Sequence, residues 1–180
     1  MVFRPKKQNG FLRGRDSSAK KPQQCAFEEV ERGDCWIAIS LAQASGLILA
    51  AQVGKHTDNL LAGLLHSTEG KTDCLKWSTD NWGGYERVLP PEVEHHITKS
   101  RTQRLERTNG IVRQQTGRFH RRQNKFSKQW RQTEMTVRLV VSYFNWIWCN
   151  SRTGTTAAER AGLTFYNWDW QDFATYPTLL

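Results

Sequence analysis

The sequence predicts a mixed α/β fold, a sheet flanked by helices, and three observations support this class. Apolar runs, turn residues and helical repeats follow one another in the order strand, strand, helix, strand, strand, helix, helix. A chain of 180 residues can bury one sizeable core. Eight Trp and eight Phe residues exceed the aromatic content of disordered chains. We expect one domain over residues 25–150, a flexible segment over 1–24 and a tail over 151–180.

A β-hairpin is the first predicted element. Cys35 to Leu41 is a short apolar run, Ala44-Ser45-Gly46 is a turn signal, and Leu47 to Val53 is a second apolar run. Two apolar runs separated by a glycine-containing turn are typical of adjacent antiparallel strands. The predicted sheet therefore contains this hairpin, whereas residues 1–24 show no periodicity and predict no element.

One helix and two further strands follow the hairpin. Thr57-Asp58 can cap a helix through residues 59–66, whose leucines recur on one face, and Glu69-Gly70 ends it. Residues 73–80 are typical of a buried strand with polar residues at its C-terminal end, and residues 95–98 of a short strand. Functional residues often lie at such strand ends in α/β sheets.

Two longer helices complete the predicted domain. The first is polar and runs from about Thr102 to Gln123, and the second runs from about Gln129 to Cys149. The second helix should turn these side chains toward the core: Val137, Val140, Val141, Phe144 and Ile147. In the tail, Thr156 and Glu159 have the spacing of a capping box.

Charge and cysteine usage narrow the classes of partner. The 26 Lys and Arg residues exceed the 17 Asp and Glu residues by nine, which favours an anionic polymer or surface as partner. The cysteines, which are Cys25, Cys35, Cys74 and Cys149, form no CxxC pair and predict buried thiols rather than a zinc or redox site. With no apolar segment typical of a secretory signal and no membrane-spanning stretch, we expect a cytoplasmic protein.

A strongly basic region follows residue 98. Between Lys99 and Gln132, eleven Lys and Arg residues surround a single acid, Glu106. Helices that are merely soluble usually mix both signs. Aromatic residues stand between the cations from Arg118 to Trp130, a pattern expected for phosphate contacts and base stacking. The alternatives are a structural counter-ion role for Glu106 and a solvated basic face with aromatics in the core.

Two carboxylates could share a metal site. Glu106, Asn109, Arg113 and Gly117 are spaced to share one helical face. Asp80 ends a predicted strand 26 residues before Glu106. Carboxylates from a strand end and a facing helix supply the oxygen ligands that a hard divalent cation needs.

Two longer motifs carry a family resemblance. Ser78-Thr79-Asp80-Asn81-Trp82-Gly83-Gly84-Tyr85-Glu86 and Thr102-Gln103-Arg104-Leu105-Glu106-Arg107-Thr108-Asn109 resemble motifs of transposases of insertion sequence 1 type. In that family the first motif holds the second acid of a DDE triad and the second motif holds the third. The resemblance extends from about Cys25 to the C-terminal end and implies a ribonuclease H-like fold.

The resemblance also implies a chemistry and a set of site residues. Asp80 and Glu106 become metal ligands and catalytic residues, with two magnesium or manganese ions promoting in-line attack on a DNA phosphodiester. Double-stranded DNA and a homo-oligomer are the implied partners, because two DNA ends must be brought together. The predicted DNA-binding residues are Lys99, Arg104, Arg107, Asn109, Arg113, Arg118, Arg121, Arg122, Lys125 and Lys128.

The first Asp of the triad has no match. Lys20-Lys21 resembles the turn that follows the first strand, which puts the Asp near Leu12, but residues 11–19 have neither the expected Trp nor an apolar strand. Asp16 is out of register. The remaining acids before the hairpin are alternative first ligands, although their position in a loop favours solvated side chains: Glu28, Glu29, Glu31 and Asp34. We therefore expect an incomplete first strand and impaired catalysis.

Three functions of different classes remain open from the sequence. The first is an active transposase or endonuclease that recruits Asp16 or an acid from a partner chain. The second is a non-catalytic DNA-binding protein that competes with the intact enzyme. The third is a structural remnant without activity. Salt-dependent DNA binding separates the first two from the third, and cleavage separates the first from the second.

Overall fold

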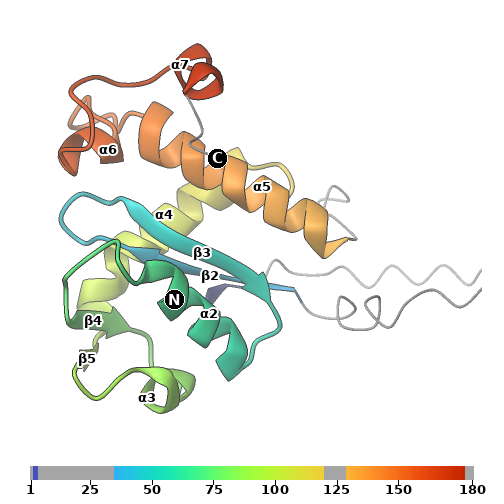
Figure 1. Ribbon diagram of the computed structural model, residues 1–180, viewed down its shortest axis with the longest axis vertical. Coiled ribbons are helices and arrows are strands. Elements are labelled where there is room, and N and C mark those ends of the chain that lie inside the picture. The colour runs from blue at the N-terminus through green and yellow to red at the C-terminus, as the bar shows by residue number, and fades with distance from the viewer. Residues whose placement is uncertain (1, 4–34, 120–128, 177–180) are drawn as a thin grey trace, which may run out of the picture.

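The computed structural model describes residues 2–3, 35–119 and 129–176. In these residues a three-stranded antiparallel sheet has the order β1-β2-β3, and a second, two-stranded parallel sheet has the order β4-β5. Helices lie on both faces of the larger sheet (Figure 1). The mixed α/β class is therefore confirmed, although the predicted single sheet is divided into two.

The predicted hairpin forms strands β2 (Trp36–Leu41) and β3 (Ile48–Gly54). They are joined by a turn in which Gly46 has a φ of 79°, a conformation that favours glycine. Strand β1 (Val2–Phe3) pairs with β2 inside the segment for which the sequence predicts no element. That prediction is wrong at these two residues because a strand this short is defined by its partner, not by its own periodicity.

Alternation along β2 divides the core between two faces of the larger sheet. Ile37 and Ile39 point to one face, where they join the core residues Ile48, Leu105, Val112, Phe119, Val137 and Phe144. Ala38 points to the opposite face, where it packs with Ala50, Leu60 and Leu64. Small residues on this second face allow helix α2 (Asp58–Thr68) to lie close to the strands (Figure 1).

Strands β4 (Lys76–Thr79) and β5 (Glu94–Ile97) form the second sheet. The short helix α3 (Gly84–Val88) lies between them. The sequence does not predict α3, because Gly83-Gly84 is typical of a break. Gly84 is nevertheless required there, since a Cβ atom would lie 2.9 Å from the Trp82 ring. Cys74, in the loop before β4, is exposed, which corrects the prediction of a buried thiol; Cys35 is buried as predicted.

Helices α4 (Lys99–Gln115) and α5 (Trp130–Ser142) cover the isoleucine face of the larger sheet. Helix α4 ends at Gln115, so the prediction that it continues to about Gln123 is wrong, and Gly117 does not share a helical face with Glu106. Residues 120–128 lie outside the described part of the chain. A π-helical turn, η1 (Tyr143–Ile147), extends α5. Within it, Asn145 accepts a hydrogen bond from Ile48 N and donates one to Ile48 O, both 2.9 Å long.

Two short helices, α6 (Ala157–Arg160) and α7 (Trp170–Thr175), follow η1. The predicted capping box is confirmed: Glu159 N donates to Thr156 Oγ1 and Thr156 N donates to Glu159 Oε2. Trp168 packs on Trp146 with ring centroids 4.5 Å apart, which ties the tail to η1. Across the described ranges, no helix is both long and apolar enough to cross a membrane.

Candidate functional site

Asp80 lies directly after β4, at the carboxyl end of a strand in the smaller sheet. The side chain is half-buried, and its Oδ1 atom is fully buried without a hydrogen-bond partner among the described residues. A buried carboxylate oxygen without a partner carries a desolvation cost, which a bound cation or a donor would offset. Asp80 therefore offers one oxygen ligand at the position that the sequence predicts.

Thr79 and His95 fix the end of the strand that presents Asp80. The Thr79 hydroxyl donates to the carbonyl oxygen of Asp80 at 2.9 Å, and Thr79 Oγ1 lies 2.6 Å from His95 Nε2 on the neighbouring strand β5. Thr79 is 2% exposed. This pairing across the parallel strands limits movement of the backbone on which the carboxylate stands.

A row of aromatic rings passes beside Asp80. The His56 ring lies between Trp36 and Trp82, with centroid distances of 4.3 and 3.9 Å. Tyr85 then contacts Trp82 edge to face at 5.6 Å. Partial burial lowers the pKa of His56, and the charge of Asp80 opposes that shift. Burial and the same charge raise the pKa of Tyr85. These electrostatic effects show that both rings lie within range of the Asp80 carboxylate.

This aromatic row was not predicted as part of the site. No motif in the sequence marks His56, His95 or Trp36 as a site residue. The ring partners are far apart in the chain, so no local spacing reveals their contact. Trp82 and Tyr85 belong to the strand motif that carries the family resemblance, which is the one available signal.

Helix α4 carries the second predicted carboxylate. Glu106 is exposed, Asn109 is buried and Arg113 is half-buried, and their spacing places them on one side of the helix. The helix packs against β4, and its first turns face the end of that strand across a shared cavity lined by Thr79, Thr102 and Leu105. Asp80 and Glu106 thus come from adjacent elements.

The described residues do not form a complete metal centre. No group of three or more His, Cys, Asp or Glu side chains in ranges 35–119 and 129–176 is placed to hold an ion. The partnerless Oδ1 of Asp80 fits a hard cation, and Glu106 on the adjacent helix has the ligand chemistry of a second donor. The acids proposed as substitutes for the first Asp, Asp16 and those at positions 28–34, lie outside the described residues.

The predicted DNA-binding residues have different environments. Arg107 and Arg118 are exposed, whereas Arg104 donates hydrogen bonds to the carbonyl oxygens of Gln43 and Ala44 in the β2–β3 turn. Arg104 therefore stabilises the β2–β3 turn of the larger sheet. Lys99 is the first residue of α4. The remaining predicted cations lie outside the described residues: Arg121, Arg122, Lys125 and Lys128.

Comparison with known proteins identifies the family. The chain is 29% identical over 127 residues to Insertion element IS1 4 protein InsB of Escherichia coli strain K12, covering 71% of this chain and 73% of that protein. It is equally similar to Insertion element IS1 protein InsB of Shigella sonnei, of which 93% is covered. A family model described as IS1 transposase matches residues 19–147, which include Asp80 and Glu106. The chain therefore belongs to the IS1 transposase family.

Proposed function

We propose that this protein binds DNA in the cytoplasm as a homo-oligomer with a ribonuclease H-like fold, and that Asp80 and Glu106 are two of the metal ligands of a transposase site. The observation that carries the proposal is the buried Oδ1 of Asp80 at the end of β4, which has no hydrogen-bond partner among the described residues and lies next to the helix that bears Glu106. Family membership supports the same assignment.

Magnesium or manganese, when bound, would supply Lewis-acid activation for phosphoryl transfer on DNA. The protein residues have distinct tasks in this proposal. Thr79 and His95 hold the strand end, so that the Asp80 carboxylate is already oriented before a ligand binds. Arg107 and Arg118, both exposed, contact DNA phosphates, and the half-buried Arg113 lies on the Glu106 side of α4.

A second candidate function is DNA binding without cutting, in competition with an intact transposase. The sequence favours this candidate because residues 11–19 lack an Asp in the register expected for the first ligand, and the described residues contain no three-ligand group. Two-metal phosphoryl transfer requires carboxylates that bridge and position both ions. We therefore propose that DNA binding is retained and that strand cleavage is weak or lost.

Duplex binding measured across a salt series tests the DNA-binding part. Fluorescence anisotropy with a labelled duplex, from about 50 to 200 mM salt, should give a steep linear fall of log affinity with log salt. Arg107→Ala and Arg118→Ala should each reduce the slope by about one. Arg152→Ala removes the same charge from an exposed residue outside the basic region and is the matched control. No binding at 50 mM salt contradicts the proposal.

Manganese binding measured by electron paramagnetic resonance tests the metal ligands separately. Asp80→Asn keeps the size of the side chain but removes its charge, and should weaken manganese binding about tenfold or more. Asp73→Asn, an exposed acid in the loop before β4, is the control. Equal manganese binding by the native protein and Asp80→Asn would exclude Asp80 as a ligand.

A further inference from the structure

An exposed apolar stripe runs along the outer side of α5 and continues onto α7. Met135 is 62% exposed and Leu139 is 52% exposed, and they stand four residues apart on the helix. Four residues further lies Tyr143, whose ring stacks on that of Trp170 with centroids 5.8 Å apart and ring planes 14° apart. Trp170 is itself 51% exposed. Residues four apart lie on the same side of a helix, so these four side chains form one continuous surface, the α5–α7 stripe.

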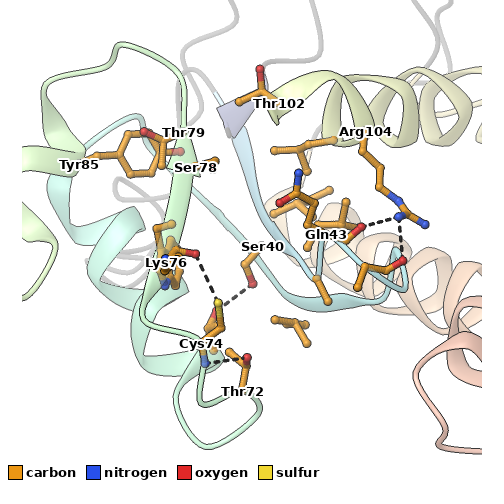
Figure 2. Close-up of a pocket in the computed structure, with 18 residues that line it drawn as sticks. Ser40, Gln43, Thr72, Cys74, Lys76, Ser78, Thr79, Tyr85, Thr102 and Arg104 are labelled. Atoms are coloured by element: carbon orange, nitrogen blue, oxygen red, sulfur yellow. Dashed lines mark hydrogen bonds between the residues drawn. The ribbon is translucent and has the colours of Figure 1, made fainter. Parts of the chain in front are cut away.

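The α5–α7 stripe points away from the rest of the fold. Val137 and Phe144, on the other side of the helix, are buried in the core beneath α5. The cavity of about 630 Å³ beside β4 is separate from the stripe (Figure 2), because none of its described lining residues lies on α5 or α7. Continuous exposed apolar surfaces of this kind are typical of protein–protein contacts. A partner on the stripe would leave the cavity beside β4 open.

The two ends of the α5–α7 stripe carry opposite charges. Arg131 is exposed and stands one helical turn before Met135, at one end. Trp170, at the other end, stands between Asp169 and Asp172, whose side chains form the capping box of α7. Asp169 is exposed to solvent. The stripe therefore has a basic end and an acidic end.

This charge distribution favours a second copy of the chain over DNA. Surfaces that stack unpaired bases combine aromatic rings with cations, whereas the aromatic end of this stripe carries two carboxylates, which repel phosphates. In the middle, Glu134 and Arg138 neutralise each other in an ion pair of 2.8 Å. A two-fold axis puts the basic end of each copy against the acidic end of the other, because such a contact is made twice. A parallel arrangement would bring like charges together.

We propose that the α5–α7 stripe is the interface of a homodimer, in which two copies pack antiparallel about a two-fold axis near Leu139. The inference rests on the proposed homo-oligomer and names its surface. Arg131 of each copy then lies close to Trp170 and Asp169 of the other copy, where a guanidinium group is favoured by the ring and by the carboxylate. Four half-exposed side chains cover less than the about 800 Å² per partner of a standard interface, so we expect a weak dimer with a micromolar Kd.

Sedimentation equilibrium of the full chain, without DNA or metal and from about 1 to 100 µM, tests the interface. Leu139→Glu puts an unpaired charge in the middle of the stripe and should raise the Kd of the dimer about tenfold or more. Leu75→Glu is the matched control, because Leu75 is 59% exposed in the loop before β4, outside the stripe. It should leave the Kd unchanged. Both replaced side chains are exposed, so both variants should keep the native Tm.

Two substitutions at Met135 test the antiparallel arrangement. Met135→Glu and Met135→Lys remove the same apolar contact, but only the glutamate meets the acidic end of the other copy with a like charge. Met135→Glu should therefore have a Kd about threefold or more above that of Met135→Lys at low salt, and the gap should narrow at high salt. The net charge of +9 acts in the opposite direction, since glutamate lowers it and lysine raises it.

The outcomes separate the interface from the proposed function. A dimer that Leu139→Glu leaves intact would overturn the α5–α7 interface and leave the homo-oligomer standing. A native chain that is monomeric at every concentration would overturn both, while duplex binding by anisotropy would still test the DNA-binding function by itself. Equal Kd values for Met135→Glu and Met135→Lys would overturn the antiparallel arrangement.

Discussion

The imidazole of His56 stacks on the indole of Trp82, with centroids 3.9 Å apart and ring planes 21° apart. His56 follows β3 of the larger sheet, and Trp82 follows Asp80 of the smaller one. Trp36, on β2, covers the other face of the imidazole. This stack therefore connects the loop that presents Asp80 to the hairpin of the larger sheet.

Replacing His56 with alanine should loosen this connection. The change removes two stacked ring pairs, each worth about 0.5–1.5 kcal/mol, so the free energy of unfolding should fall by about 1–2 kcal/mol. Urea denaturation measures the change. His56→Phe keeps both stacks and should retain most of the stability. A His56→Ala variant as stable as the native protein would show that the stack contributes nothing.

Stability should also depend on pH through His56. Partial burial holds the pKa of His56 below its usual 6.5 in the folded protein, so the unfolded chain binds the proton more readily. The contribution of His56 is thus fully present above pH 6.5 and is lost as the pH falls through the lowered pKa. The Tm of the native protein should therefore fall relative to that of His56→Phe on acidification over this window, and an unchanged offset between the two Tm values would contradict the assignment.

Asn145 should be important for stability despite being polar. Asn145→Ala leaves the buried N–H and C=O groups of Ile48 without their partners and should cost about 2–4 kcal/mol. Asn150→Ala is the control, because the Asn150 side chain accepts one hydrogen bond from the exposed Arg152 and should cost less than about 1 kcal/mol. If urea denaturation gave equal losses of unfolding free energy for the two variants, the two hydrogen bonds between Asn145 and Ile48 would contribute no more than the bond between Asn150 and Arg152.

Arg104 and Arg107 should differ although they are three residues apart on one helix. Arg104→Ala removes the hydrogen bonds to the carbonyl oxygens of Gln43 and Ala44, so it should lower Tm and raise amide exchange in the β2–β3 turn. Arg107 is exposed, and Arg107→Ala should leave both unchanged. The structural role of Arg104 is wrong if its variant matches Arg107→Ala in both measurements.

Local sequence signals were sufficient for most elements of the fold. The hairpin was predictable because two apolar runs flank Gly46, and α2, β4 and β5 follow equally clear local patterns. Features that depend on residues far apart in the chain could not be predicted from local signals. Strand β1 has two residues and is defined by β2, and α3 depends on the fit of Gly84 beneath Trp82. The division into two sheets is likewise a tertiary property.

The candidate site shows the same limit. The family motifs predict Asp80 and Glu106 as site residues, and this assignment stays a prediction, although α4, which carries Glu106, contacts β4, which ends next to Asp80. No motif could predict the row of rings beside Asp80, because His56 meets Trp36 and Trp82 only after folding. Arg104 and Arg107 have the same residue type, so the sequence could not show that Arg104 binds the β2–β3 turn while Arg107 is exposed to solvent.

The most direct measurement of the central claim is nicking of a supercoiled plasmid in magnesium or manganese, alongside duplex binding by the same preparation. An incomplete triad predicts salt-dependent binding, with nicking by the native protein no greater than that by Glu106→Gln. Metal-dependent nicking that Glu106→Gln abolishes would contradict the loss of cleavage and show that a third ligand is recruited to Asp80 and Glu106.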